Sequence, residues 1–420
     1  TKVKIGGMAH LTGPYTEVTV PIYELWMDYT PCWNEEVGKK IGVEIDLIAE
    51  DCRTDPTLIT EIWMRFRDEP VVACIFCTSA ENTILLDELA ANQVPAVTTS
   101  STWYPYIPTG WTFNGYVQND SEIVTVVQWL ETPEGKEYAK DTPWVKEGRK
   151  PCIGFIGWDS PLGRSPIAPL FGYCKKHNLP WAGAELVPMT LATAEAQLER
   201  LVARGADCIE VNCCGSCPAI ILRDAYRLKL MERGIILFSG TTFAPEQLRL
   251  AEGAAEGAVC ANSYGQPEEN FPAWQKLQRL HKERTGKELT YSFLYLGAYG
   301  AASILYESIR YLVEDKGVDP AKITGEDIRD ALLSGEAEVD TKGAFAEPFH
   351  YIHGSGLSSA HKCRMTEWHW KPEEKDGYFE ILTDWMPYWP DLYVPPEEAE
   401  ARRAELVASE KEAMKGPWTP

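Results

Sequence analysis

Apolar positions in the first 100 residues come in short runs, separated by longer segments in which apolar residues recur with helical spacing. The runs predict four buried strands: VKIGGMA at 3–9, VEIDLIAE at 43–50, VVACIFC at 71–77 and VPAVTTS at 94–100. The intervening segments predict helices over 18–37, with an interruption at Pro31, and over 55–67 and 80–91. This alternation is typical of βαβ units in a parallel sheet.

The alternation restarts after residues 131–150, a polar segment with Pro and Gly that we interpret as a surface insertion. The later runs predict strands at 152–158, 184–189, 208–214, 235–240 and 257–263. Helices are predicted over 167–176, 194–203 and 218–230. A second α/β sheet of similar design therefore follows the first, without a repeat at the level of single residues.

From residue 266 onward the pattern is mainly helical. Helices are predicted over 268–284 and 293–313, and a third begins at Thr324 with a capping-box-like spacing to Asp327. Strand-like pieces at 365–370 and 377–382 flank the turn KDG. The tail ends in a charged helix over 396–414, for which packing on its own protein is favoured over a role as an interaction arm. A chain of 420 residues exceeds one ordinary core, so two lobes are expected.

The formal net charge of −22 disfavours nucleic acid and anionic membrane surfaces as partners. The sequence has no run of about 18 apolar residues, and its first residues, TKVKIGGMA, lack the core of a signal peptide. We therefore expect either a cytosolic protein or one whose export signal has been removed. The even number of 12 cysteines is compatible with an oxidising compartment.

Hydroxyl side chains follow two of the predicted strands, at the sheet edge where ligands of parallel sheets bind. In CTSAEN, Thr78 and Ser79 precede a helix, so they either cap it or offer hydroxyl and N–H groups to an anion. In TTSSTWYPY, four hydroxyls at 99–102 precede Trp103, Tyr104 and Tyr106. Hydroxyls beside aromatic rings suit a small polar ligand with an apolar body, and a loop packed by its own aromatics is the alternative.

Motifs for catalysis are missing from the sequence: there is no G-x-G-x-x-G after a strand, no G-x-x-x-x-G-K-[ST], no G-x-S-x-G and no H-E-x-x-H. His10 lies at an early strand end, where a satisfied loop histidine is favoured over a ligand contact. We predict no catalytic residue, no metal and no cofactor.

The stretch VNCCGSCP at 211–218 places Cys213, Cys214 and Cys217 close together. Three thiols leave a zinc or iron–sulfur site one ligand short. A disulfide of Cys213 or Cys217 with Cys260 is one alternative, and small side chains that shape a binding wall are the favoured one. Ser216 is predicted to cap the helix that follows.

Four segments resemble a known family in order and spacing: VKIGGMAHLTGPY, AEDCRTDP, IFCTSAENTILLDELAANQVPAVTTSST and AAEGAVCANSYG. From residue 1 to about 385 the chain is similar to the periplasmic ligand-binding proteins of ABC transporters, in the branch that binds leucine, isoleucine and valine, amides and aromatic acids. The resemblance implies an α/β fold with two doubly wound parallel-sheet lobes, a three-stranded hinge and a ligand cleft. Lobe 1 would comprise 1–119 and 263–360, lobe 2 would comprise 120–262 and 361–385, and the tail 386–420 would pack on them.

The resemblance implies a set of ligand-binding positions. Ser79 and the loop Ser100, Ser101 and Thr102 match residues that hold the ligand carboxylate in amino-acid binders. The remaining positions would form walls or replace family contacts: Tyr15, Trp103, Trp158, Asp159, Leu162, Cys214 and Thr241. Thr241 stands where amino-acid binders carry an acidic partner for the ammonium group, and a neutral Thr cannot offset that charge. A carboxylate without the amine, an aromatic acid or an amide is therefore favoured, with Asp159 as the alternative ammonium partner.

Family members often carry a disulfide that Cys52 and Cys77 match, which implies export to the periplasm or its equivalent. The implied function is an extracytoplasmic solute-binding protein that is not an enzyme. It would act as a monomer and deliver a small organic ligand to ABC transporter permease subunits. The alternatives are a ligand-sensing receptor module of the same fold, an amino-acid binder that uses Asp159, and a thiol- or metal-dependent enzyme that uses Cys213, Cys214 and Cys217.

Overall fold

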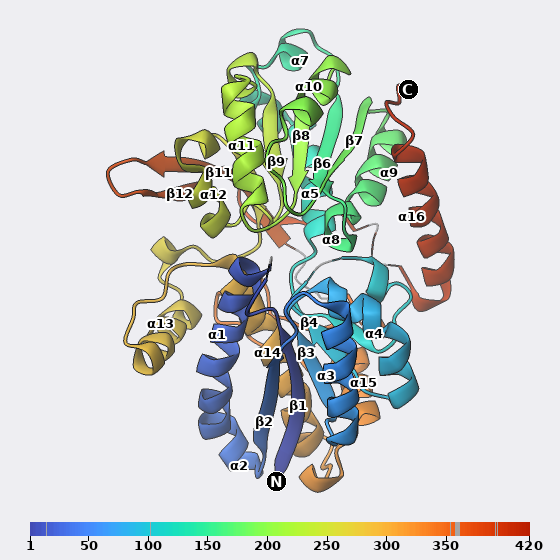
Figure 1. Ribbon diagram of the computed structural model, residues 1–420, viewed down its shortest axis with the longest axis vertical. Coiled ribbons are helices and arrows are strands. Elements are labelled where there is room, and N and C mark those ends of the chain that lie inside the picture. Colours follow the sequence, from blue (N-terminus) through green and yellow to red (C-terminus); the bar gives the residue numbers. More distant parts are fainter. Residues whose placement is uncertain (14, 101, 353, 358–361, 391, 393) are drawn as a thin grey trace. The chain divides into compact units, whose positions relative to one another are not determined.

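The structure is a computed structural model that describes residues 1–420 except 14, 101, 353, 358–361, 391 and 393 (Figure 1). It forms two compact units. Unit 1 comprises Thr1–Gln118, Tyr264–His361 and Pro395–Ala399, and unit 2 comprises Asn119–Ser263, Lys362–Val394 and Glu400–Pro420. Within the described residues, no helix combines the length and apolar character needed to cross a membrane.

The sheet of unit 1 is parallel, with the strand order β2-β1-β3-β4-β5. Its strands are β1 (Lys2–Ala9), β2 (Glu44–Asp51), β3 (Ala73–Phe76), β4 (Ala96–Thr98) and β5 (Thr112–Asn114). Strand β1 lies between β2 and β3, because Ile5 pairs with Leu47 on one side and with Ala73 on the other. The four strands that the sequence predicts in residues 1–100 are all present.

Helices flank this sheet: α1 (Thr16–Trp33), α2 (Lys39–Ile41), α3 (Pro56–Asp68), α4 (Ser79–Asn92), α13 (Pro272–Thr285), α14 (Phe293–Glu314) and α15 (Gly325–Ser334). The long helix predicted over 293–313 is α14, which is buried along most of its length. Thr324 and Asp327 form the expected capping box of α15. The predicted interruption at Pro31 is wrong, because Pro31 lies inside α1 and the irregularity is a π-helical turn that follows at Asn34–Gly38.

The sheet of unit 2 has the order β12-β11-β10-β9-β8-β6-β7, with β13 paired to β11. Its parallel part contains β6 (Ile153–Trp158), β7 (Trp181–Val187), β8 (Cys208–Asn212), β9 (Ile236–Ser239) and β10 (Val259–Asn262). The antiparallel part contains β11 (Lys362–Lys371), β12 (Asp376–Ile381) and β13 (Met386–Pro387). Strands β11 and β12 form the hairpin expected around the turn KDG, which projects from the unit in Figure 1.

The helices of unit 2 are α5 (Asn119–Leu130), α6 (Pro133–Tyr138), α7 (Pro143–Lys146), α8 (Pro161–Arg164), α9 (Ile167–His177), α10 (Glu195–Ala203), α11 (Cys217–Arg227), α12 (Pro245–Ala251) and α16 (Ala399–Ala413). Residues 131–150, expected as a surface insertion, contain α6 and α7 and bury Trp144. The C-terminal helix α16 is held by a hydrogen bond from Trp181 Nε1 to Ala413 O, at 3.2 Å. Trp418 then pairs antiparallel with Trp181 at the edge of β7.

Candidate ligand-binding site

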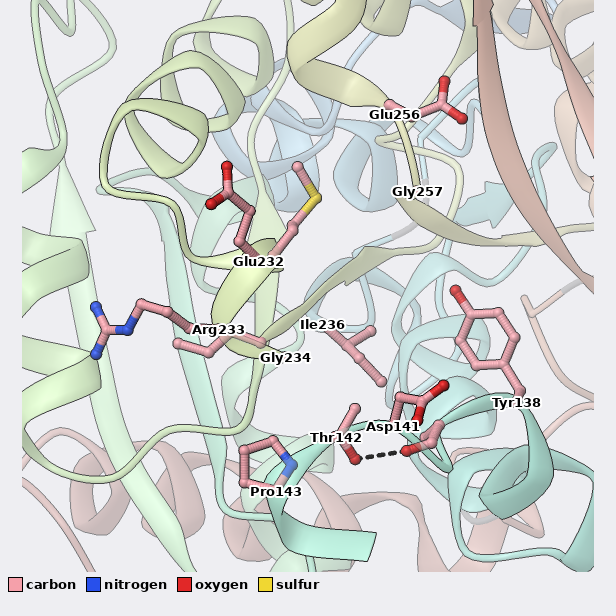
Figure 2. Close-up of a pocket in the computed structure, with 13 residues that line it drawn as sticks. Tyr138, Asp141, Thr142, Pro143, Glu232, Arg233, Gly234, Ile236, Glu256 and Gly257 are labelled. Atoms are coloured by element: carbon pink, nitrogen blue, oxygen red, sulfur yellow. Dashed lines mark hydrogen bonds between the residues drawn. The ribbon is translucent and has the colours of Figure 1, made fainter. Parts of the chain in front are cut away.

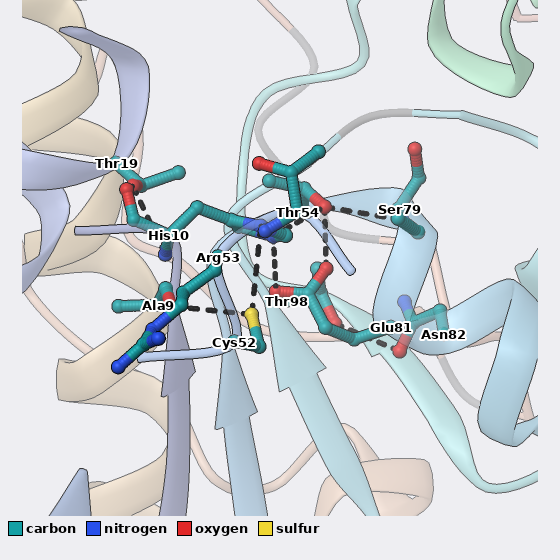
Figure 3. Close-up of polar contacts among 12 residues, drawn as sticks. Ala9, His10, Thr19, Cys52, Arg53, Thr54, Ser79, Glu81, Asn82 and Thr98 are labelled. Carbon is teal, nitrogen blue, oxygen red and sulfur yellow. Dashed lines mark hydrogen bonds and ion pairs between the residues drawn. The ribbon is translucent and has the colours of Figure 1, made fainter. Parts of the chain in front are cut away.

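At the carboxyl edge of the unit 1 sheet, the wholly buried His10 links three segments of the chain (Figure 3). The backbone N–H of Thr54 donates to His10 Nδ1 at 2.9 Å, so this nitrogen is the acceptor and the ring proton lies on Nε2. His10 Nε2 lies 3.1 Å from Glu81 Oε1, and the other carboxyl oxygen of Glu81 accepts the hydroxyl of Thr78. The imidazole therefore joins the loops after β1 and β2 to the first turn of α4.

The ligand atoms of His10, Cys52 and Glu81 lie within 4.8 Å of one another, which is close enough to share a metal ion. A metal on Nε2 would move the ring proton to Nδ1, where it would face the N–H of Thr54. The thiol of Cys52 donates to Ala9 O at 3.1 Å, and burial raises its pKa. We therefore interpret these residues as a hydrogen-bond network that orders the edge of the sheet.

The disulfide expected between Cys52 and Cys77 is not present, and both residues are buried free thiols. The pairing that the resemblance implies is therefore not seen. Both residues lie beside the end of β1, where Cys52 N–H donates to Ala9 O and Cys77 N–H donates to Met8 O. The thiol of Cys52 is engaged there by its hydrogen bond to Ala9 O.

Ser79 is the first residue of α4, and Thr78 is its N-cap, with a hydrogen bond from Ala80 N to Thr78 Oγ1 at 3.1 Å. The Ser79 side chain points away from the His10 network in Figure 3. Its backbone carbonyl accepts the hydroxyl of Thr83, as expected inside a helix. The start of α4 therefore presents a hydroxyl together with the positive end of a helix dipole, an arrangement that favours an anion.

A second buried network fixes the loop that follows β4. The carbonyl of Ser100 accepts Asn114 Nδ2 at 2.7 Å and the hydroxyl of Tyr106 at 3.0 Å. The Tyr106 hydroxyl in turn accepts Asn82 Nδ2 at 3.1 Å, and Asn82 Oδ1 accepts the hydroxyl of Thr98 at 3.0 Å. Sequence reasoning missed Asn82 and Asn114. The sequence signal that could have identified them is a polar residue at a helix or strand position where an apolar residue is expected.

The same loop holds two buried hydroxyls that have no hydrogen-bond partner among the residues the structure describes. They belong to Thr99 and to Thr102, whose exposed fraction is 1%. A buried polar group without a partner costs about 1–3 kcal/mol, which a bound acceptor would recover. Ser101 lies outside the described residues. Ser79, Ser100 and Thr102 thus follow two neighbouring strands, β3 and β4, at the same edge of the sheet.

Two aromatic candidates belong to unit 1 as well. Trp103 is buried, and its ring meets that of Tyr104 edge-on with centroids 5.7 Å apart. Tyr15 is buried at the start of α1, with its ring centroid 5.4 Å from that of His10. The Tyr15 ring therefore lies beside the His10 network, whereas the Trp103 ring packs against Tyr104 within its own loop.

In unit 2, Trp158 and Asp159 stand at the end of β6 and Leu162 lies in α8. The Asp159 side chain is 59% exposed and pairs with Arg164, whose Nε lies 2.7 Å from Oδ1. The carbonyl of Leu162 accepts Asn212 Nδ2 at 2.7 Å. Asp159 therefore already has a cationic partner, which weakens its candidacy as a ligand's ammonium partner.

Thr241 is buried, and its hydroxyl donates to Asn119 Oδ1 at 3.3 Å within unit 2. The Thr241 N–H donates to Glu122 Oε2 at 3.0 Å. Asn119 also donates from Nδ2 to Asn212 Oδ1 at 3.1 Å. The polar groups of Thr241 are therefore used inside unit 2, so the sequence-based assignment of Thr241 as a ligand contact gains no support.

Cys213, Cys214 and Cys217 are buried free thiols at the end of β8 and the start of α11. Burial raises the pKa of Cys214 to about 12, which keeps its thiol protonated at neutral pH. Ser216 occupies the N-cap position of α11, but its side chain makes no capping hydrogen bond, contrary to expectation. The stretch therefore supplies small apolar side chains rather than reactive thiolates.

Glu122, which sequence reasoning missed, is a wholly buried acid in the first turn of α5. It accepts the N–H of Thr241, the hydroxyl of Ser263 and, at 3.4 Å, the hydroxyl of Tyr388. Burial outweighs these hydrogen bonds and raises the pKa of Glu122 to about 7. The residue therefore joins three segments of unit 2 and titrates near neutrality.

This pKa predicts a pH dependence of stability. Between roughly pH 4 and 7 the folded protein retains a proton on Glu122 that the unfolded chain has released, so stability falls as the pH rises through this window. The expected loss is about 3 kcal/mol. We expect Glu122→Gln to remove this part of the pH dependence of stability. Urea denaturation of the wild type and the variant at pH 5 and pH 7.5 would measure the difference. An equal pH dependence in wild type and variant would contradict the assignment.

Comparison with known proteins identifies the family. The sequence model described as "Periplasmic binding protein" matches residues 2–356. The chain belongs to the periplasmic binding protein family. The α/β fold with two parallel-sheet lobes, expected from the resemblance, is confirmed. No curated protein matches the sequence of this periplasmic binding protein.

Solved structures share the fold at low sequence identity. A branched-chain amino acid ABC transporter protein from Thermus thermophilus with bound valine matches with a TM-score of 0.74, 19% identity, and coverage of 92% of this chain and 97% of that one. A fatty acid ABC transporter substrate-binding protein from Thermomonospora curvata matches with a TM-score of 0.73 and 18% identity, and the match covers 92% of both chains. A solute-binding protein from Rhodopseudomonas palustris in complex with 3,4-dihydroxybenzoic acid matches with a TM-score of 0.73 and 13% identity, and the match covers 92% of this chain and 97% of that one.

Proposed function

We propose that this periplasmic binding protein captures a small organic carboxylate outside the cytoplasm and delivers it to the permease subunits of an ABC importer, without chemistry of its own. The observation that carries the proposal is the pair of buried hydroxyls at Thr99 and Thr102, which have no hydrogen-bond partner in the described part of the chain and follow the strand next to the one that leads into Ser79 and α4. Such a site is costly in the empty protein, and a ligand with acceptor oxygens removes the cost.

A carboxylate fits this edge better than a cation does. The hydroxyls of Ser79 and Thr102 can donate hydrogen bonds, and α4 contributes the positive end of its dipole. The networks around His10 and Tyr106 hold both segments in place before the ligand arrives. This preorganisation supports affinity, because the ordering cost of the loops is met during folding.

The class of ligand is narrowed by the two positions that were candidates for binding an ammonium group, Thr241 and Asp159. Thr241 has no carboxylate, and its hydroxyl and N–H are bound to Asn119 and Glu122. The carboxylate of Asp159 is paired with Arg164, so neither position offers a ligand's ammonium group an unengaged carboxylate. Trp103 directly follows Thr102 in the chain and is a buried aromatic side chain in the same loop. An acid without an α-amino group, aromatic or aliphatic, is therefore favoured. The related structures with bound valine and bound 3,4-dihydroxybenzoic acid show that the fold accommodates both kinds of ligand.

A thermal-shift screen with matched compounds tests this proposal. Benzoate is compared with benzamide and phenylalanine, and butyrate with butyramide and valine. We expect an acid to raise the midpoint by about 2–4 °C at a hundredfold excess over Kd, and its amide and amino-acid counterparts to have smaller effects. A shift by the amino acids alone would contradict the ligand class. A shift by zinc with no shift by any organic compound would contradict the transport function.

A further inference from the structure

A pocket of about 240 Å³ lies within unit 2, between α9 and the C-terminal helix α16. Helix α9 contributes Pro169, Gly172 and Lys176, and α16 contributes Arg402 and Leu406. The other lining residues are Trp389, Ala168, Ser409 and Glu405, so two cationic side chains and one carboxylate face this space. Among the described residues, no strand of the unit 2 sheet lines this pocket.

The walls of this pocket are held in place by contacts outside its centre. Ser409 on α16 donates its hydroxyl to Ala168 O on α9 at 2.9 Å. Lys175 on α9 pairs with Glu412 on α16 at 2.9 Å. Because Ala168 and Ser409 also line the pocket, the first of these contacts fixes its wall without a ligand.

Arg402 gives the pocket its chemistry. Its side chain is 14% exposed, and its guanidinium lies 5.9 Å from the ring centroid of Trp389. Nη1 donates to Glu405 Oε2 at 2.7 Å, while the buried Nε has no hydrogen-bond partner among the described residues. A guanidinium with an unsatisfied N–H is suited to a carboxylate, because planar oxygens can accept from its edge.

We propose that the pocket between α9 and α16 is a second binding site, which takes a small organic anion. The carboxylate accepts from Arg402, Lys176 adds positive charge, and an apolar or aromatic body lies along Trp389 and Leu406. A volume of about 240 Å³ limits the ligand to a single ring or a short chain. A ligand there would join the C-terminal helix to the body of unit 2.

A larger pocket of about 500 Å³ in the same unit provides the contrast (Figure 2). Its lining includes Asp141, Glu232 and Glu256 but only one basic residue, Arg233. Carboxylates therefore outnumber the cation, and an organic anion is disfavoured there. Arg233 offers a control, because its replacement removes the same charge from unit 2 at a different pocket.

Gly172 allows the pocket to be filled without removing a charge. A Cβ atom on Gly172 would meet only Ser409 Oγ, at 3.8 Å, so a larger side chain fits the backbone and projects into the space beside α16. Gly172→Leu is expected to occupy the pocket, whereas Gly172→Ala leaves most of it open. Both replacements raise the helix propensity of α9, so the fold should be retained.

The test uses the full chain and 4-bromobenzoate. Crystals soaked with this probe should show anomalous bromine density between α9 and α16 in wild type and in Gly172→Ala, and none there in Gly172→Leu. In solution, fluorine NMR with 4-fluorobenzoate should show one of its binding events weakened at least fivefold by Gly172→Leu and by Arg402→Gln, and unchanged by Arg233→Gln.

Bromine density absent from this pocket in wild type would overturn the proposal, and so would density that persists in Gly172→Leu. Equal weakening by Arg402→Gln and Arg233→Gln would also overturn it, because the effect would then be one of overall charge. Binding at the carboxyl edge of unit 1 neither supports nor overturns the second site, because the edge is tested by different variants, Ser79→Ala and Thr102→Ala. The two proposals therefore fail or succeed independently.

Discussion

Replacing His10 with alanine is expected to lower the free energy of unfolding of unit 1 by about 3–5 kcal/mol. The loss arises because Glu81 is wholly buried and, within the part of the chain that the structure describes, would keep only the hydroxyl of Thr78 as a partner. The Thr54 N–H would lose its acceptor in the same step. Hydrogen exchange of peptides from β1 and α4 would report the change within unit 1.

A double replacement distinguishes the loss of the His10–Glu81 interaction from the loss of packing around it. His10→Leu with Glu81→Met removes the buried polar partners together, so it should cost less than His10→Ala alone. If the single and the double variant were equally destabilised, lost packing rather than an unpaired carboxyl group would be the cause. A loss below about 1 kcal/mol for His10→Ala would contradict the network itself.

Replacing Ser79 and Thr102 together with alanine is expected to abolish ligand binding. Two hydrogen bonds to a charged group contribute about 1.5–3 kcal/mol each, so their loss corresponds to a weakening of about 100-fold or more. Titration calorimetry with the best acid from the screen would measure it. Thr60→Ala is a suitable control, because this exposed hydroxyl only donates to Pro56 O within α3.

The same variant carries an opposite prediction for the empty protein. Thr102 contributes a buried hydroxyl that has no hydrogen-bond partner among the described residues, so its removal should leave the unliganded protein at least as stable as wild type. This combination of lost binding with retained stability is typical of binding residues that are costly in the absence of ligand. A destabilised empty protein would instead assign Thr102 a structural role.

Much of the fold could be predicted because a strong pattern of apolar residues specifies a helix or a strand without information about residues far away in the sequence. The apolar run at 293–313 is long enough to specify the buried helix α14, and Thr324 with Asp327 specifies its own cap. The carboxyl edge could also be predicted, since the end of each strand is visible in the sequence. Ser79, Ser100 and Thr102 follow β3 and β4 for this reason.

The remaining features depend on strand order and on contacts between distant residues. The Cys52–Cys77 disulfide that the resemblance implies is not present, and the Cys52 thiol donates instead to Ala9 O, a contact across the sheet edge that the sequence does not show. Glu122 binds Ser263 and Tyr388, which are 141 and 266 residues away in the sequence. No local pattern marks such a partner. Thr241 was placed correctly at a strand end, but its bond to Asn119 could not be foreseen.

The most direct measurement is a crystal structure of the complex with the acid that gives the largest thermal shift. We expect ligand density at the carboxyl edge of unit 1, with the carboxylate oxygens about 3 Å from the hydroxyls of Ser79 and Thr102. The buried Thr102 hydroxyl would then have a partner. A ligand whose carboxylate binds elsewhere, with the Thr102 hydroxyl still unpaired, would contradict the central claim.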